Sequence, residues 1–146
     1  MGFTSFPKEL ISIETNSNEI SEKMVAISMN GLIGLVDKIF PGYVDIIPIY
    51  EKKVNIPALI QRTNQNIVLE GTGERNILLI KNFKNNSNII LNDKIFTSGL
   101  GDKYPKGFLL GNVINISSLE DESSLKVEVK SLINFDSGTK LLLVLP

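Results

Sequence analysis

The 146-residue chain contains no cysteine, no histidine and no tryptophan. Without cysteine there are no disulfide bonds and no thiolate nucleophiles, and without histidine the usual zinc sites and histidine general bases are also excluded. The net charge of −1 gives no electrostatic reason to expect nucleic acid or an anionic membrane surface as a partner. No segment approaches the ~20 apolar residues that a helix needs to cross a bilayer. Enzymes that use a cysteine nucleophile or a histidine base and zinc proteins of the usual kind are therefore excluded at the outset, and no membrane-spanning helix is predicted within this sequence.

Short apolar runs separated by turn residues are what the sequence does contain. Hydrophobic residues make up 42% and charged residues 21%, which is a globular composition, and the length fits one ordinary domain or two very small ones. Residues 125–130 (L-K-V-E-V-K) alternate between apolar and charged, which predicts a half-buried strand. Turn signals recur about every 8 to 12 residues, a spacing typical of a β-sandwich or a small β-barrel. The sequence therefore predicts an all-β fold.

Two turns predict hairpins. Asn30-Gly31 lies between the apolar runs 24–29 and 32–39, and we expect a type I′ turn there because that turn needs φ > 0 at both central residues. Gly71-Thr72-Gly73 predicts a second hairpin that leads into residues 76–80. The terminal run 141–145 does not alternate, so we expect both of its faces to be covered or the strand to lie in a closed sheet.

Ser98 is the first candidate for catalysis, because it lies in a glycine-rich segment, T-S-G-L-G. A serine nucleophile needs a base, and no histidine is present. Only a dyad with Lys94, Lys103 or Lys106 remains. Two of these lysines flank an exposed glycine turn, where we expect too little burial to lower the pKa of an amine. We therefore interpret Ser98 as a loop serine that satisfies backbone groups.

Acidic segments provide the other candidates. Glu120, Asp121 and Glu122 are consecutive in a serine-rich stretch and lack the spaced oxygen ligands of a calcium loop. Residues 70–74 (E-G-T-G-E) lack the lysine of a phosphate-binding loop, and no helix is predicted after them. We predict no catalytic residue, no metal ligand and no cofactor, and hence no enzyme.

The remaining possibility is a surface that binds partners. Tyr, Phe and Met are enriched as anchors in protein interfaces. Tyr43, Tyr50, Phe83 and Tyr104 lie at predicted turns or strand ends, so we predict them as partner-contact residues. The alternative for each is a partly buried core aromatic.

Residues 97–113 read T-S-G-L-G-D-K-Y-P-K-G-F-L-L-G-N-V. Glycine supplies φ > 0 and proline fixes φ, so this segment is expected to be a tight, shaped loop between two strands. The string closely resembles the signature of the MreC family, the rod shape-determining proteins of bacterial cell-wall synthesis. Residues 30–36 (N-G-L-I-G-L-V) and 92–96 (N-D-K-I-F) resemble two further segments of that family. Asn92 and Asp102 stand where the family more often has glycine.

The resemblance extends over residues 10–145 and implies a particular architecture. It implies two small β-barrels packed side by side, with the second inserted in the first. On this reading residues 1–47 plus 119–146 form the first barrel and residues 48–118 form the inserted barrel.

The resemblance also implies a function, that of a non-enzymatic scaffold on the periplasmic side of the bacterial inner membrane. Such a scaffold would bind and activate the elongation-specific penicillin-binding protein, a peptidoglycan transpeptidase. It would also contact other membrane proteins of the rod complex and self-associate as a dimer or filament. Family members carry an N-terminal membrane helix and a coiled coil, and neither is visible here. We therefore expect this chain to be the C-terminal part of a membrane-anchored protein.

Two alternatives stay open. The first is a peptidoglycan-binding module that holds glycan or muropeptides in a groove between the barrels, although the absence of tryptophan opposes it. The second is a degenerate hydrolase on a trypsin-like barrel that would use Ser98.

Overall fold

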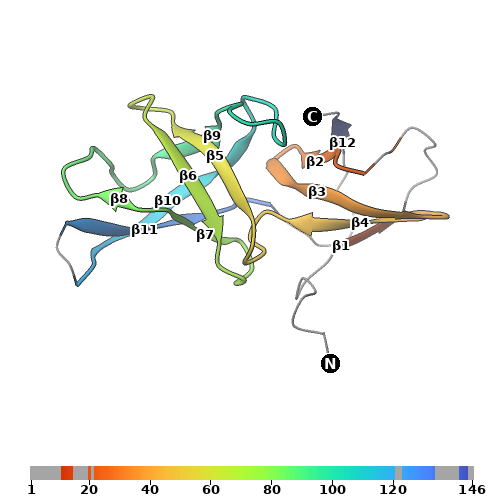
Figure 1. Ribbon diagram of the computed structural model, residues 1–146, viewed down its shortest axis with the longest axis horizontal. Helices are drawn as coiled ribbons and strands as arrows, with labels where there is room; N and C mark the ends of the chain where they lie inside the picture. The colour runs from red at the N-terminus through yellow and green to blue at the C-terminus, as the bar shows by residue number, and fades with distance from the viewer. Residues whose placement is uncertain (1–10, 15–19, 21, 121–122, 134–141, 145–146) are drawn as a thin grey trace.

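The computed structural model describes residues 11–14, 20, 22–120, 123–133 and 142–144 (Figure 1). These residues form twelve strands in two antiparallel sheets and no helix. The two sheets lie side by side along the longest axis of the molecule (Figure 1). The predicted all-β fold is confirmed.

The first sheet has five strands in the order β1-β4-β3-β2-β12. Their bounds are Ile11–Glu14 for β1, Val25–Ser28 for β2, Gly31–Phe40 for β3, Tyr43–Pro48 for β4 and Leu142–Val144 for β12. The central strand β3 is the longest of them, and it extends away from the second sheet (Figure 1).

The second sheet closes into a barrel. Its strands are β5 (Asn55–Ile60), β6 (Asn66–Gly71), β7 (Ile77–Ile80), β8 (Phe83–Lys84), β9 (Lys94–Thr97), β10 (Leu109–Ser118) and β11 (Ser124–Lys130). The order is β10-β9-β5-β6-β7-β11-β8, and an additional pairing between β10 and β11 joins the ends into a ring of six strands. The short β8 pairs with β11 outside this ring.

The barrel is inserted between β4 and β12 of the first sheet. Residues 124–130 pair with β10 and β7 in the barrel sheet, whereas residues 119–146 were predicted to belong to the first barrel. As predicted, β11 alternates, with Val127 and Val129 fully buried. The exact limits of the two units stay a prediction.

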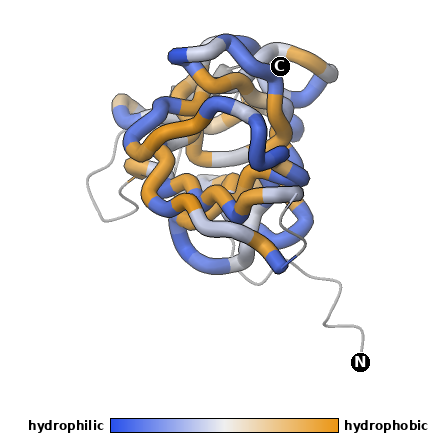
Figure 2. The backbone as a smooth tube through the Cα atoms, turned by 90° about the vertical axis from the view of Figure 1, so that its left-hand side faces the viewer, coloured by the Kyte–Doolittle hydropathy of each residue, from blue (hydrophilic) through white to orange (hydrophobic). Residues whose placement is uncertain are grey.

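Two apolar clusters fill the molecule. The larger one lies in the barrel and includes Leu69, Leu78 and Ile95, and it also takes in Val25 and Leu32 from the first sheet. In Figure 2, which views the molecule from the barrel end, apolar and polar stretches alternate along the strands. The smaller cluster lies on the other face of the first sheet (its members are Met24, Ala26, Ile33, Val36, Val44, Ile46 and Ile133). The first sheet is therefore packed against the barrel rather than tethered to it.

The β2–β3 hairpin joins these two parts. The hairpin is confirmed, but its turn is not the predicted one: Ser28 pairs with Gly31, so Met29 and Asn30 form the connection. Asn30 does not have positive φ, and its N–H donates to Ser28 Oγ at 3.2 Å. Gly31 has φ 131°, and a Cβ there would lie 2.5 Å from the carbonyl oxygen of Leu109. Glycine is therefore needed at position 31 because β10 approaches closely there, and not because position 31 forms the tip of the turn.

Candidate partner-binding surface

Three of the four predicted contact aromatics lie in the core. Tyr50, Phe83 and Tyr104 are 1%, 2% and 5% exposed, so in this conformation their rings are not available to a partner. Burial raises the pKa of Tyr104 to about 12. The prediction placed Tyr50 and Tyr104 at turns correctly, but their side chains are buried, and Phe83 and Tyr104 belong to the barrel cluster. Tyr43, at 39% exposed, is the predicted residue that remains accessible.

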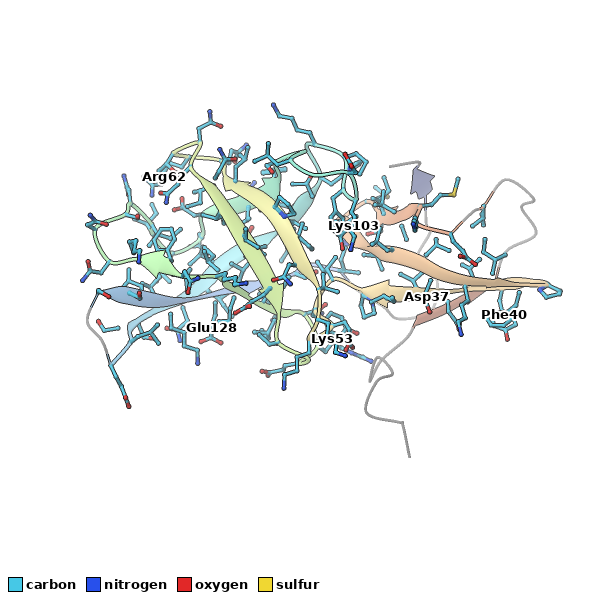
Figure 3. All side chains as sticks on the ribbon, in the orientation of Figure 1. Asp37, Phe40, Lys53, Arg62, Lys103 and Glu128 are labelled. Atoms are coloured by element: carbon cyan, nitrogen blue, oxygen red, sulfur yellow. The ribbon has the colours of Figure 1, made fainter. Side chains whose placement is uncertain are left out.

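Tyr43 belongs to an aromatic pair at the end of the β3–β4 hairpin. Phe40 and Tyr43 face each other in register, with ring centroids 4.8 Å apart and planes 15° apart. Ile39 beside them is 41% exposed. We call Ile39, Phe40 and Tyr43 the hairpin tip. Figure 3 shows Phe40 at the end of the molecule that lies farthest from the barrel.

The turn and the neighbouring pair of charges fix this tip. Gly42 supplies the positive φ, 85°, that the turn after Pro41 requires. Two residue pairs back from Phe40 and Tyr43 along the hairpin, Lys38 lies directly across from Asp45, and opposite charges in that position favour the pairing. The tip thus presents a preformed aromatic pair to solvent.

The signature loop between β9 and β10 is tightly organised by Thr97. Its hydroxyl donates to the carbonyl of Pro105 at 2.6 Å and accepts from the N–H of Phe108 at 2.8 Å. A Cβ on Gly99 would lie 2.7 Å from Lys106 Cβ, so the two arms of the loop are in contact. The shaped loop predicted from the sequence is confirmed, whereas the role of Thr97 was missed.

Ser98 has the role predicted for it. Its hydroxyl accepts the N–H of Leu100 at 3.2 Å, and its own N–H donates to the carbonyl of Pro57 at 3.1 Å. These bonds hold the loop against β5. Among the residues that the structure describes, no group of three or more His, Cys, Asp or Glu side chains is placed to hold a metal ion.

A second exposed apolar site, which the sequence analysis did not predict, lies on the barrel. Arg62 makes a bidentate ion pair with Asp93, from Nε to Oδ1 at 2.7 Å and from Nη2 to Oδ2 at 2.9 Å. Asp93 Oδ2 also accepts the N–H of Ile90 at 2.9 Å. The pKa of Asp93 is held below its ordinary value, mainly by the hydrogen bonds from the Arg62 guanidinium and also by the one from Ile90. The clamped turn exposes Ile90 and Leu91 by 51% and 55%.

The described part of the chain contains no helix long and apolar enough to cross a membrane. The family model described as the rod shape-determining protein MreC, barrel core, matches residues 8–145. The chain belongs to the MreC family. The resemblance that the glycine loop indicated is confirmed over nearly the whole sequence.

A curated relative and several solved structures agree with this assignment. The cell shape-determining protein MreC of Streptococcus pneumoniae is 30% identical over 131 residues, which cover 86% of this chain and 48% of that protein. The chain therefore spans about half the length of this relative. The crystal structure of MreC from Pseudomonas aeruginosa matches with a TM-score of 0.85 at 20% identity, covering 92% of this chain and 88% of that one.

A complex is also among the similar structures. MreC from Helicobacter pylori, solved with a penicillin-binding protein, matches with a TM-score of 0.65 at 17% identity and covers 92% of this chain and 87% of that one. At this identity the likeness shows the shared MreC fold, and the bound protein is a property of the Helicobacter complex.

Proposed function

We propose that this chain is a non-enzymatic scaffold of bacterial cell-wall elongation, which binds and activates the elongation-specific penicillin-binding protein. The observation that carries the proposal is the family membership over residues 8–145 together with the penicillin-binding protein held by the Helicobacter relative. The absence of histidine and the use of the Ser98 hydroxyl as a backbone acceptor support a role without catalysis.

Activation would follow from selective binding. A scaffold that binds one conformation of an enzyme more tightly than another shifts the enzyme toward that conformation. A preference of ~1.4 kcal/mol shifts the ratio of the two conformations about tenfold. A rigid surface suits this task because little of its binding free energy is spent on ordering itself.

The same family membership supports a proposal for the place of action. We propose that the chain works on the periplasmic side of the inner membrane, as part of a protein anchored in that membrane. Other membrane proteins of the rod complex and further copies of the scaffold are its additional partners.

The hairpin tip is the surface that we propose for the transpeptidase. Tyr43 is large, amphipathic and exposed, and Phe40 holds its ring in place by stacking. Aromatic side chains of this kind dominate the binding energy of protein interfaces. The tip also projects beyond the rest of the sheet (Figure 3), so a partner can reach it without displacing the barrel.

Calorimetry with the periplasmic domain of the transpeptidase from the same organism tests both parts of the proposal. We expect saturable binding that Tyr43→Ala weakens at least tenfold, about 1.4 kcal/mol, and that Tyr43→Phe largely retains. Leu100→Ser is a matched control, since Leu100 is 57% exposed and lies on a different loop.

The outcomes separate the two parts. If the folded chain shows no binding and no effect on the rate of the transpeptidase, the scaffold proposal is overturned. Binding that Tyr43→Ala leaves unchanged would keep the scaffold and reject the hairpin tip as its contact surface.

A further inference from the structure

The hairpin between β2 and β3 carries the dipeptide Asn30-Gly31, which occurs once in the chain, and every other asparagine is followed by a residue with a side chain. An asparagine can react with its own main chain when the nitrogen of the next residue attacks the side-chain carbonyl carbon. A following glycine favours this attack because it has no Cβ to hinder the approach. Asn30 is therefore the asparagine of this chain that is most prone to the reaction.

The surroundings of Asn30 leave its side chain free to react. The residue is exposed, so water can reach it. Its main-chain N–H donates to Ser28 Oγ at 3.2 Å, whereas its side-chain amide makes no hydrogen bond with any residue that the structure describes. The carbonyl carbon of the side chain can therefore turn toward the nitrogen of Gly31 without breaking an existing contact.

The packing of the two units requires the glycine that makes Asn30 reactive. Gly31 has φ 131°, and a Cβ there would lie 2.5 Å from the carbonyl oxygen of Leu109. A larger residue at position 31 would slow the attack, but it would also push β3 away from β10. The contact between the first sheet and the barrel thus depends on keeping a reactive dipeptide in an exposed turn.

We propose that Asn30 is a site of spontaneous deamidation, and that the product loosens the contact between the first sheet and the barrel. The main-chain nitrogen of Gly31 loses its proton and forms a bond to Asn30 Cγ. The Cγ–Nδ2 bond breaks, and Nδ2 leaves as ammonia with that proton. A cyclic imide remains, and the reaction to this point needs no oxidant, cofactor or enzyme.

One water molecule then opens the imide at either of its two carbonyl carbons. Opening between the Gly31 nitrogen and Cγ of residue 30 gives aspartate, with the main chain unchanged. Opening between the same nitrogen and the main-chain carbonyl carbon of residue 30 gives isoaspartate. In isoaspartate the main chain runs through Cβ and Cγ and is one atom longer. Both products carry a carboxylate, so the chain gains one negative charge.

The longer main chain of isoaspartate does not fit this turn. Ser28 pairs with Gly31, so Met29 and Asn30 alone connect the two strands, and connections of this length have few allowed conformations. An additional main-chain atom is expected to move Gly31 away from Leu109 or to break its pairing with Ser28. Aspartate adds charge at an exposed position and leaves the pairing in place.

Ageing the whole chain in mildly alkaline buffer, well below its melting temperature, tests the modification. Peptide mass spectrometry should show conversion of the Asn30 amide to the acid, and labelling by isoaspartyl methyltransferase should rise with it. Asn82 is the internal control. It is also exposed and lies in the connection between β7 and β8, but Phe83 follows it. We expect Asn82 to remain an amide while most of Asn30 reacts.

The effect on the structure is tested with the separated product and two variants. Anion exchange isolates the deamidated chains by their additional negative charge. We expect these chains, in which isoaspartate predominates, to unfold roughly 2–8 °C below the fresh wild type. Fresh Asn30→Asp, which adds the charge alone, should unfold close to the wild type. Asn30→Gln would have to form a larger ring, so it should neither react nor lose stability on ageing.

Hydrogen exchange locates the change and separates the outcomes. In the deamidated chains the amides of β2 and β3 should lose protection while those of β5 and β6 keep it. If Asn30 in the folded chain reacts no faster than Asn82, the turn protects it and the modification site is rejected. If isoaspartate forms but melting temperature and protection stay those of the wild type, the proposed loosening is rejected. These tests do not involve the transpeptidase and are independent of the scaffold proposal.

Discussion

The barrel and the five-stranded sheet are built from similar antiparallel strands, but they differ in how their edges end. Pairing of β10 with β11 gives each of the six barrel strands two neighbours. Among the residues that the structure describes, β1 and β12 at the edges of the first sheet each have one neighbour. Closure removes free edges and satisfies the backbone hydrogen bonds of every strand, so the barrel completes its own structure and the sheet does not.

The apolar cores of the two units also differ in how far each unit supplies its own core. The barrel cluster is the larger and is built mainly from barrel strands. The sheet has a smaller cluster on one face, and on its other face Val25 and Leu32 complete the barrel cluster. The sheet thus depends on the barrel for one of its two faces. We expect the barrel to be the more autonomous unit.

Removing one buried aliphatic side chain from each core tests that difference and should have the largest effect on stability. Leu69 in the barrel and Ile46 in the sheet are both fully buried, and truncation to alanine should cost ~2–5 kcal/mol at either position. Leu69→Ala should destabilise both units, because the sheet needs the barrel. Ile46→Ala should loosen the sheet and leave the barrel folded.

Urea unfolding followed by hydrogen exchange distinguishes the two variants. In Ile46→Ala the amides of β5, β6 and β9 should keep their protection while those of β3 and β4 lose it. Equal loss of protection in both units would mean that the molecule folds as one cooperative body.

The contact between the two units is tested by a pair of glycines. Gly31 and Gly42 both have positive φ, but a Cβ on Gly31 would meet the Leu109 carbonyl, whereas a Cβ on Gly42 would meet nothing within 4 Å. Both alanine variants bear the backbone strain of ~1 kcal/mol. Gly31→Ala also bears a steric clash of ~1–3 kcal/mol. Thermal unfolding should therefore place Gly31→Ala clearly below Gly42→Ala. Equal melting temperatures would show that the sheet can move away from β10 at little cost.

Local patterns allowed the strands, hairpins and family to be predicted. Asn30-Gly31 and Gly71-Thr72-Gly73 predicted two hairpins, and both are present. Alternation over residues 125–130 predicted the buried face of β11. The glycine loop at residues 97–113 predicted both a shaped loop and the family. Each of these signals lies within a few residues of the structure that it specifies.

Features that depend on distant residues could not be predicted in this way. Arg62 and Asp93 are 31 positions apart, and nothing in either local sequence indicates that they meet. Tyr50 and Tyr104 are buried, and Tyr104 packs in the barrel cluster with residues far from it in the sequence, which no local pattern indicates. For the same reason the predicted turn at Asn30-Gly31 was misplaced by one residue. Gly31 is required by the close approach of the Leu109 backbone in β10, and the local sequence does not show this contact.

The smallest expected effect sharpens the comparison between the two ends of the molecule. Ring stacking supports the hairpin tip, and an ion pair holds the barrel turn that exposes Ile90 and Leu91. Because Arg62 lowers the pKa of Asp93 below its ordinary value of 3.8, the stabilisation is fully present above that value. It is lost as the pH falls through the lowered pKa of the folded state. Asp93→Asn should lack it at every pH.

The amide of Ile90, which donates to Asp93, reports on this directly by NMR. We expect its exchange to be slower in the wild type than in Asp93→Asn at pH 6, after correction for intrinsic rates, and the difference to disappear in acid. The amides of β3 and β4 beside the hairpin tip should show no such difference. If Asp93→Asn protects Ile90 as well as the wild type does at pH 6, neutral hydrogen bonds alone hold the turn.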